Sequence, residues 1–367
     1  MKFSCNTQTL NQAIMNVTLA VSQKSGLPAL EGILVRAKDG LVRMVGYNLE
    51  LGITTTIQTR VAEDGEVVIP AKLFSEIVRK IDSDEVSISC DPRFLVEING
   101  GVSQFTILGM SALEFPELPA VGDGVGVTLG RKTLSSMIDQ TLFAVSTSDA
   151  KPVHTGCLFV LEEDQITLVA VDGFRLAMRK EKAAIQQSIR FIVPGRTLSD
   201  LLKLLGDSDD MLELQVSRKH ILFTLGDCSV ISRLLEGEFL DYNAAIPKES
   251  ATTVTVSTRA LLSSIERTSL LITDKIKSPL KVAFGDGLIK MSCSTTIGKA
   301  YDECVCAIDG TPLEMGFNNR YLMDALKHSE SDMVKLEMGG PLSPMKVVPL
   351  QDDSFLFLVL PMRLKAD

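Results

Sequence analysis

Aromatic and imidazole side chains are scarce in this sequence. Its 367 residues include no tryptophan, four tyrosines and three histidines. Proteins that hold single-stranded nucleic acid rely on aromatic side chains that stack on bases, so the scarcity argues against that class. His154, His220 and His328 are too far apart for metal-ligand spacing, and we expect no metal site.

Long apolar runs are also missing. No stretch approaches the roughly 18 consecutive apolar residues of a transmembrane helix, so we expect no membrane partner. The N-terminus passes from Met1-Lys2-Phe3 directly into polar residues, without the apolar segment of a signal peptide. We therefore expect a cytoplasmic protein.

The cysteines do not form a disulfide framework. There are seven of them, an odd number, with no CxxC pair. Cys304 and Cys306 lie two residues apart in a strand-like run and would share a face. Because no further ligand type lies near them in the sequence, we predict a pair of core cysteines. A reducing compartment fits this usage.

Motifs for nucleotide-dependent and hydrolytic chemistry are absent too. The sequence has no GxxxxGK[ST] loop, no GxGxxG, no GxSxG and no HExxH. We predict that the protein is not an enzyme and has no cofactor. One alternative is a small-molecule enzyme in which Asp172 and Arg175 form an acid and anion site. Another is a purely structural oligomer.

The charge balance is acidic. There are 37 basic and 46 acidic residues, which give a net charge of −9. Taken over the whole chain this argues against nucleic acid as a partner. A whole-chain charge does not describe any single face, however, and a basic face on an acidic protein can still bind phosphates.

What the sequence does contain is a threefold repeat. One pattern begins with the cation Lys72, which is followed by an apolar residue two positions later and an acid four positions later. The same pattern begins again at Arg196 and at Arg320, at intervals of 124 residues. A second pair, Leu10 and Ile14, returns as Leu134 with Ile138 and as Leu261 with Ile265. The period is far longer than that of a solenoid repeat, so each copy is a domain.

The repeat predicts three domains, 1–120, 126–247 and 252–367. Linkers rich in proline, glycine or alanine, residues 114–124 and 244–251, lie just before each restart. Each copy has two helix patterns among about eight strand patterns, which predicts an α+β domain with antiparallel sheets. For the second copy we expect helices at 131–142 and 197–205, and strands at 127–129, 156–161, 166–171, 174–178, 212–216, 221–225 and 230–234.

Several segments together resemble one family. They are Phe115-Pro116, Val169-Ala170-Val171-Asp172-Gly173-Phe174-Arg175-Leu176-Ala177, Ile192-Val193-Pro194-Gly195-Arg196, the run 232–242, and Leu360-Pro361-Met362-Arg363-Leu364. In order and over the whole chain, they are similar to the bacterial DNA polymerase III beta subunit, the sliding clamp.

The resemblance implies a ring of six like domains, built by two three-domain protomers joined head to tail as a homodimer. Helices would line a central hole and sheets would form the outside. The implied partners are double-stranded DNA, bound without sequence preference, a clamp loader, and DNA polymerase III with other replication and repair clients that bind through short peptides.

A ring that moves along DNA should contact phosphates and not bases, since base contacts would hold it at one sequence. Cations on the repeated second helices meet that requirement, and the family places a further cation in the loop after the first helix. The expected DNA-facing residues are Lys24, Lys72, Arg79, Lys80, Arg196, Lys203, Arg320 and Lys327. The alternative is a set of solvated helix faces with pairs such as Glu76 with Lys80.

Ring closure needs a joint between the first and third domains of two protomers. The alternating run 104–108 could be an exposed edge strand. By the resemblance, Phe105 and Ile107 would meet Leu271 and Ile272 of the other protomer. The alternative for all four residues is ordinary core packing.

The resemblance also implies a cleft that takes short client peptides. An apolar groove with one or two cations suits a peptide with apolar anchors and an acidic group. Val171, Phe174 and Leu240 depart from the family pattern, as does the added tail Lys365-Ala366-Asp367. The matching positions are His154, Val171, Gly173, Phe174, Arg175, Leu176, Leu240, Ala244, Ala245, Leu358, Val359, Leu360, Pro361, Met362, Arg363 and Leu364.

Overall fold

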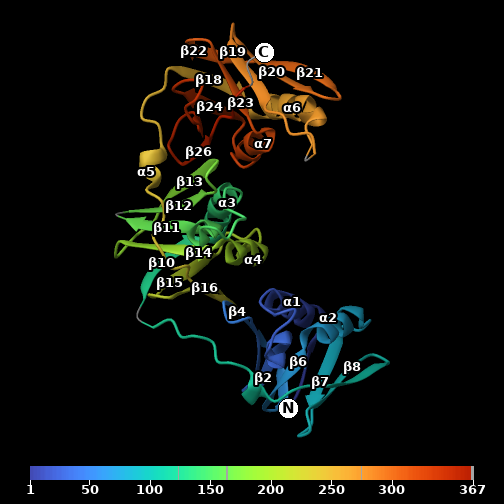
Figure 1. Cartoon of the computed structure of the whole chain (residues 1–367). Helices are drawn as coiled ribbons and strands as arrows, with labels where there is room; N and C mark the ends of the chain where they lie inside the picture. The colour runs from blue at the N-terminus through green and yellow to red at the C-terminus, as the bar shows by residue number, and fades with distance from the viewer. Residues whose placement is uncertain (123, 163, 274, 365–367) are drawn as a thin grey trace. The chain divides into compact units, whose positions relative to one another are not determined.

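The computed structural model describes residues 1–122, 124–162, 164–273 and 275–364. Figure 1 shows the helices and strands of the chain, coloured from the N-terminus to the C-terminus. The chain divides into two compact units. The first contains Met1–Lys132 and Ser199–Leu234, and the second contains Thr133–Leu198 and the chain from Leu235 onward. The division therefore runs through the second copy of the repeat and not through the linkers.

All three copies have the same order of elements: a strand, a helix, several strands, a second helix and three final strands. The first copy consists of β1 (Lys2–Asn6), α1 (Thr7–Thr18), β2 (Gly32–Lys38), β3 (Leu41–Tyr47), β4 (Leu51–Gln58), β5 (Arg60–Glu63), β6 (Gly65–Pro70), α2 (Ala71–Lys80), β7 (Glu85–Cys90), β8 (Leu95–Gly100) and β9 (Ser103–Leu108).

The second copy has one strand fewer than the first. It consists of β10 (Val125–Gly130), α3 (Arg131–Leu142), β11 (Gly156–Glu162), β12 (Gln165–Val171), β13 (Arg175–Lys182), β14 (Ile189–Pro194), α4 (Gly195–Leu205), β15 (Met211–Val216), β16 (His220–Leu225) and β17 (Cys228–Arg233). A short helix that the sequence did not predict, α5 (Tyr242–Ala245), occupies the start of the expected second linker.

The described residues of the third copy form nine strands and two helices. It consists of β18 (Thr252–Ser257), α6 (Thr258–Thr268), β19 (Leu280–Gly285), β20 (Leu288–Thr295), β21 (Gly298–Val305), β22 (Ala307–Gly310), β23 (Leu313–Phe317), α7 (Asn319–Lys327), β24 (Met333–Met338), β25 (Met345–Val348) and β26 (Phe355–Val359). Short 3-10 turns are η1 (Pro28–Glu31), η2 (Ala112–Glu114), η3 (Pro152–Thr155) and η4 (Ser269–Leu271).

The sheets confirm the predicted antiparallel α+β class, because every pairing of the described strands is antiparallel. The first unit holds a sheet in the order β5-β1-β7-β8-β9 and another in the order β10-β15-β16-β17-β4-β3-β2-β6. The second unit holds β14-β11-β12-β13-β26-β25-β24-β18-β22 and β21-β20-β19-β23. Two of these sheets cross copy boundaries, through the pairs β17–β4 and β13–β26.

The repeated apolar residues form the cores beneath the first helices. Leu10 and Ile14 of α1 are fully buried, and their counterparts on α3 and α6 are buried as well. Helix α1 begins where the sequence supplies a cap: the side chain of Asn6 accepts a hydrogen bond from the backbone N–H of Thr9 at 3.0 Å. Within the part of the chain that is described, we find no helix both long and apolar enough to cross a membrane.

The predicted cysteine pair is only half correct. Cys304 is buried on β21, as expected. Cys306 lies beyond the end of β21 and is only partly buried, because the strand stops at Val305 and its alternation does not continue. All seven cysteines are free thiols.

Candidate functional site

A pocket of about 590 Å³ lies in the second unit beside the turn that joins β12 to β13. Apolar side chains, backbone and side-chain amides, hydroxyls and two cations surround it. Its lining residues are Gly173, Phe174, Ile272, Thr273, Lys277, Ser278, Asn318, Asn319, Arg320, Tyr321, Leu360, Pro361 and Met362.

The β12–β13 turn presents Phe174 to this pocket. Oδ1 of Asp172 accepts hydrogen bonds from the backbone N–H groups of Phe174 at 2.9 Å and Arg175 at 3.0 Å. Gly173 has φ of +92°, a conformation that residues with a Cβ rarely adopt, so the turn requires glycine there. Phe174 is 60% exposed, and its ring stacks on Tyr321 with centroids 6.1 Å apart.

Arg175 is next to the pocket but faces the protein. Its Nε binds Oδ2 of Asp172 at 2.9 Å, and its Nη1 binds the carboxylate of Asp324. The guanidinium also lies over two rings, 4.6 Å from the centroid of Tyr321 and 5.6 Å from that of Phe143. With 13% of its side chain exposed, this cation is already satisfied within the fold.

The C-terminal segment closes the other side of the pocket. The N–H of Leu360 donates to the carbonyl of Phe174 at 2.9 Å, and that of Met362 donates to the carbonyl of Gly316 at 2.7 Å. These two bonds hold residues 360–362 between the β12–β13 turn and β23. Met362 remains 43% exposed, so its flexible thioether is available to a ligand.

The structure brings together only part of the predicted client-cleft set. Gly173, Phe174, Leu360, Pro361 and Met362 line the pocket. Four others are core residues, since each is at most 5% exposed: Val171, Leu176, Leu358 and Val359.

The remaining predicted cleft residues lie outside the pocket lining. His154 packs edge-to-face on Phe239, with ring centroids 5.5 Å apart. Burial lowers the pKa of His154, as does the nearby charge of Lys151. Leu364 is partly buried, and those with exposed side chains are Leu240, Ala244, Ala245 and Arg363. The tail Lys365-Ala366-Asp367 lies outside the described residues.

Eight pocket residues come from the third copy and were not predicted for the cleft. They belong to the segment after α6 and to the start of α7: Ile272, Thr273, Lys277, Ser278, Asn318, Asn319, Arg320 and Tyr321. Two of them carried other predictions, Ile272 for the dimer interface and Arg320 for DNA. No local sequence pattern indicates the other six, because they come to line one pocket with Phe174 only after the chain has folded.

The repeated cations occupy equivalent places in the three copies. Lys72, Arg196 and Arg320 are each the second residue of a helix, α2, α4 and α7, and all three are exposed. Of the other predicted DNA-facing residues, Lys203 binds Asp200 at 2.7 Å and Lys327 binds Glu266 at 3.4 Å.

Most of these cations have no acidic partner among the residues that the structure describes. Arg320 has an interaction partner of its own. No ion pair joins any described acid to the remaining members of the set, which are Lys24, Lys72, Arg79, Lys80 and Arg196. The alternative pair of Glu76 with Lys80 is therefore not formed. These helices present uncompensated positive charge on a chain whose net charge is −9.

The predicted edge strand is confirmed. β9 is the outermost strand of its sheet and pairs only with β8. Phe105 and Leu108 on it are 38% and 66% exposed, while Ile107 is partly buried. In the second unit, Leu271 and Ile272 are partly buried at the end of η4, and β21 is an outermost strand with exposed Tyr301 and Val305.

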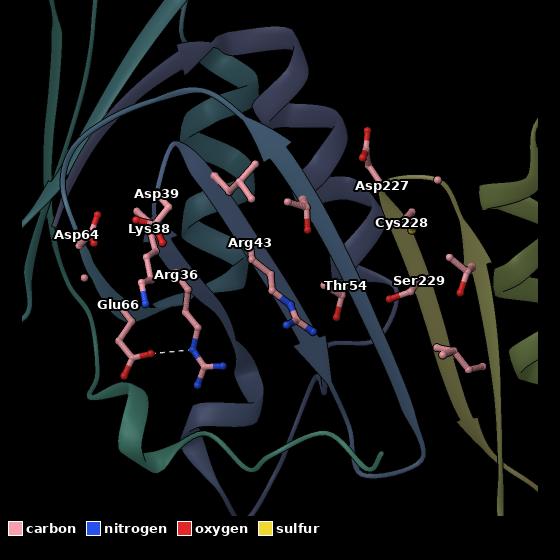
Figure 2. A pocket seen from close by; sticks show the side chains of 17 residues that line it. Arg36, Lys38, Asp39, Arg43, Thr54, Asp64, Glu66, Asp227, Cys228 and Ser229 are labelled. Carbon is pink, nitrogen blue, oxygen red and sulfur yellow. Dashed lines mark hydrogen bonds and ion pairs between the residues drawn. The ribbon is translucent and has the colours of Figure 1, made fainter. Parts of the chain in front are cut away.

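A second, more open hollow of about 940 Å³ lies on one face of the sheet that contains β2, β3, β4 and β17. Figure 2 shows Arg36 bound to Glu66, at 2.7 Å, with Arg43 on the neighbouring strand. Arg36 and Arg43 are direct cross-strand partners. The lining holds three cations and the four acids Asp39, Asp64, Glu66 and Asp227, so its charges nearly cancel.

Metal chemistry has no visible site. Within the described ranges, no cluster of three or more His, Cys, Asp or Glu side chains could hold a metal ion. Burial raises the pKa of the Cys157 thiol to about 12, with smaller opposing effects from hydrogen bonds to Thr141 and Val169. The thiol is therefore protonated at neutral pH and is a weak nucleophile.

Comparison with known proteins gives one consistent family. Three models of the DNA polymerase III beta subunit match in chain order: the N-terminal domain at residues 1–119, the central domain at 128–241 and the C-terminal domain at 243–363. The chain belongs to the beta sliding clamp family.

Individual members agree over their full length. The beta sliding clamp of Staphylococcus epidermidis is 34% identical over 361 residues, covering 95% of this chain and 96% of its own length. That of Staphylococcus aureus is 32% identical with the same coverage.

Solved clamp structures agree as well. The DNA polymerase sliding clamp from Bacillus subtilis matches with a TM-score of 0.96, 30% identity and 100% of both chains. The DNA polymerase III subunit beta from Pseudomonas aeruginosa matches with a TM-score of 0.94 and 26% identity, covering 99% of this chain and 100% of its own.

Proposed function

We propose that the protein is a non-catalytic DNA sliding clamp of the cytoplasm. Two copies close head to tail into a ring around duplex DNA, and a clamp loader places the ring there. The ring then tethers DNA polymerase III and other client proteins to the template. The domains are residues 1–120, 126–247 and 252–367.

The observation that carries the proposal is the full-length similarity to solved sliding clamps, with a TM-score of 0.96 over 100% of both chains for one of them. A match restricted to one domain would support only the fold. Here all three repeated domains match in order, so the architecture on which a clamp depends is present.

The cation pattern supports a DNA-facing role for the second helices. Topological enclosure needs no sequence-specific contact, and mobile phosphate contacts allow the ring to move along the duplex. Lys72 and Arg196 present charge from the same helical position in two copies and have no acidic partner among the residues placed in the structure. Solvent exposure alone gives no functional reason for a cation at the same helical position in these copies.

The open sheet edges support ring closure. An exposed edge strand with apolar side chains, such as β9 with Phe105, favours pairing with another chain. We propose that Phe105 and Ile107 pack against Leu271 and Ile272 of the other protomer. A head-to-tail interface of this kind joins two different sheet edges. It produces a closed ring when the rotation that relates one protomer to the next returns to the starting protomer.

The pocket beside Phe174 is the proposed client site. Phe174, Leu360 and Met362 line the pocket with exposed side chains that can provide apolar contacts to a peptide. The rival enzyme hypothesis loses support here, because its candidate pair, Asp172 and Arg175, is bound to itself and to Asp324.

The decisive experiment compares retention on circular and linear DNA. Labelled protein is loaded by a compatible clamp loader with ATP onto a nicked circular plasmid, which is then cut once with a restriction enzyme. We expect the protein to stay on the circle at high salt and to leave the linear form by its ends. Equal dissociation from both forms would show that attachment is electrostatic, and the clamp proposal would be abandoned.

A further inference from the structure

The described lining of the client pocket contains cations but no carboxylate. Among its described lining residues, Lys277 and Arg320 are positive and none is Asp or Glu. Asp172, next to the lining residue Gly173, and Asp324, on the same helix as Arg320, are both bound to Arg175. In a chain with 46 acidic residues and a net charge of −9, an apolar pocket with no acid in its described lining favours a ligand that carries negative charge.

The cations in and beside this pocket are not equally available. Arg175 is enclosed by two carboxylates and two aromatic rings. Arg320 has an interaction partner of its own. Lys277 is exposed and forms no hydrogen bond or ion pair with any residue that the structure describes.

The backbone on both sides of Lys277 is fixed. The N–H of Thr273 donates to the carbonyl of Ile276, and the N–H of Ile276 donates back to Oγ1 of Thr273, both at 3.1 Å. On the other side, Oγ of Ser278 donates to the carbonyl of Ser294 at 3.0 Å. Lys277 therefore belongs to a loop that these hydrogen bonds hold on both sides, and its exposed side chain lines the pocket.

We propose that Lys277 is a specificity-determining residue of the client site, which binds the carboxylate of an Asp or Glu next to the apolar anchors of a client peptide. This inference rests on the proposed client function of the pocket. The apolar side chains hold the anchors, and Lys277 selects among peptides by the charge beside them. A long, exposed lysine side chain gives modest selection, typical of a solvated ion pair.

The test measures binding of fluorescein-labelled decapeptides by fluorescence anisotropy at low salt. Each peptide has the same central Leu and Phe anchors. The acidic set carries Asp at one of the three positions on either side, and the matched set carries Asn or Lys there. The proteins are the full chain, Lys277→Glu, Lys277→Ala, and the control Lys275→Glu, whose side chain is exposed on the same loop but does not line the pocket.

We expect at least one Asp position to bind the unaltered protein about three- to fivefold more tightly than its Asn counterpart, as for exposed ion pairs. Lys277→Ala should remove that preference, and Lys277→Glu should turn it into a preference for the Lys peptide of the same position. Lys275→Glu should keep the preference for Asp. The preference should weaken as salt is raised, because screening reduces the interaction of exposed charges.

The possible failures separate the two proposals. If peptides bind only when the Leu and Phe anchors are present, but Asp, Asn and Lys peptides bind alike and Lys277→Glu changes nothing, the role of Lys277 is wrong and the client site stands. An equal effect of Lys275→Glu would mean that only the general charge of the loop matters, which also overturns the proposal. If anchored peptides bind no better than peptides with both anchors replaced by Ser, the client site itself is wrong.

Discussion

Two cations near one pocket, Arg175 and Lys277, have opposite surroundings. Arg175 has two carboxylates and two rings around it and is largely buried, whereas Lys277 is exposed and unpaired within the described structure. A buried, multiply bonded guanidinium serves the fold, because its removal leaves buried charge behind. A solvated ammonium can serve a ligand.

Arg175→Ala should therefore destabilise the protein. Its loss leaves Asp172, with 13% of its side chain exposed, without its ionic partner. We expect a loss of about 2 kcal/mol in the free energy of unfolding, as for a largely buried pair with one partner removed. Thermal unfolding should show a fall in Tm of about 4–8 °C for a unit of this size.

The matched control is Arg190→Ala. Arg190 binds Glu162 at 2.7 Å in the same compact unit, but both side chains are about half exposed. Exposed pairs contribute about 1 kcal/mol or less, so Tm should change little. Equal shifts for the two variants would mean that the burial of Arg175 does not matter.

Acid sensitivity should depend in part on Glu337. Burial by itself would raise the pKa of this carboxyl, but hydrogen bonds and charges of Lys335 and Lys346, at 2.8 and 2.5 Å, hold the pKa below its usual value of 4.5. A lowered pKa in the folded state contributes stability that is present above the unfolded value and disappears as pH falls through the folded one.

Glu337→Gln removes this contribution at all pH values. We expect the unaltered protein to have the higher Tm at pH 6–7, and the difference between the two proteins to shrink as pH falls below about 4.5. Differential scanning fluorimetry across pH 3–7 measures this difference in Tm. A difference that stays constant down to pH 3 would exclude titration of Glu337 as its cause.

Predictability from the sequence was uneven at the residue scale. The turn at Asp172-Gly173 was predictable, because an Asp side chain and a glycine at positive φ determine such turns locally. The burial of Leu176 was hidden, since an apolar residue can equally line a pocket or fill a core. Lys277 could not be found, because its place at the pocket depends on residues about 100 positions away in the sequence.

Among the elements, β9 should control assembly. Phe105→Asp puts a charge on its exposed apolar side, which should prevent pairing with another chain, because a buried unpaired charge is costly. We expect the proposed dimer to dissociate at least about 100-fold more readily, given the apolar surface a phenylalanine buries and the charge replacing it. Sedimentation velocity at micromolar concentration should then show monomers.

Leu113→Asp is the control for this variant. Leu113 is exposed in η2 and belongs to no sheet edge. Its substitution should leave the oligomeric state unchanged, while both variants keep the Tm of the parent. A dimeric Phe105→Asp variant would place the interface elsewhere.

The second helices should determine the salt dependence of DNA binding. Arg79→Ala combined with Lys80→Ala removes two exposed cations from the last turn of α2. If both contact phosphates, the slope of log affinity against log salt should fall by up to about 1.8, that is about 0.9 for each contact. Anisotropy with a short duplex at several salt concentrations measures the slope.

The control removes the same charge from strands. Lys38 and Arg43, on β2 and β3, are also exposed. Their double alanine variant should retain the parental slope. If both double variants change the slope equally, DNA binding follows net charge and not the helix faces.

Element boundaries were predictable where periodicity was strong. The helix expected at 131–142 is α3 with the same bounds. The second helix of this copy, α4, was expected at 197–205 but begins at Gly195. The earlier start was not predicted, because glycine is a poor helix former and gives no helical signal. Its lack of a Cβ is required there, since one would lie 2.9 Å from a side-chain carbon of Val145 and 3.0 Å from the carbonyl of Thr155. β14 (Ile189–Pro194) was not predicted, because a proline before an apolar, helix-spaced run is typical of a helix start and conceals a strand that ends there.

For the whole molecule, the sequence repeat predicted the number of copies but not how the chain divides into compact units. The repeat places boundaries between copies, whereas the compact units divide the second copy. The cause is hydrogen bonding between copies, through β17 with β4 and β13 with β26. Such pairings join segments that are far apart in sequence, so no local pattern reveals them.

These shared sheets also affect how the protein can be dissected. A gene fragment that encodes one repeat would keep the hydrophobic core of its domain. It would lack the strand of the adjoining repeat that pairs with β4, β13, β17 or β26. Each of these strands would become an exposed edge strand, whose unpaired backbone N–H and C=O groups can pair with another chain. Single repeats expressed alone should accumulate as insoluble material, and the smallest soluble product would span the strand partners from adjoining repeats.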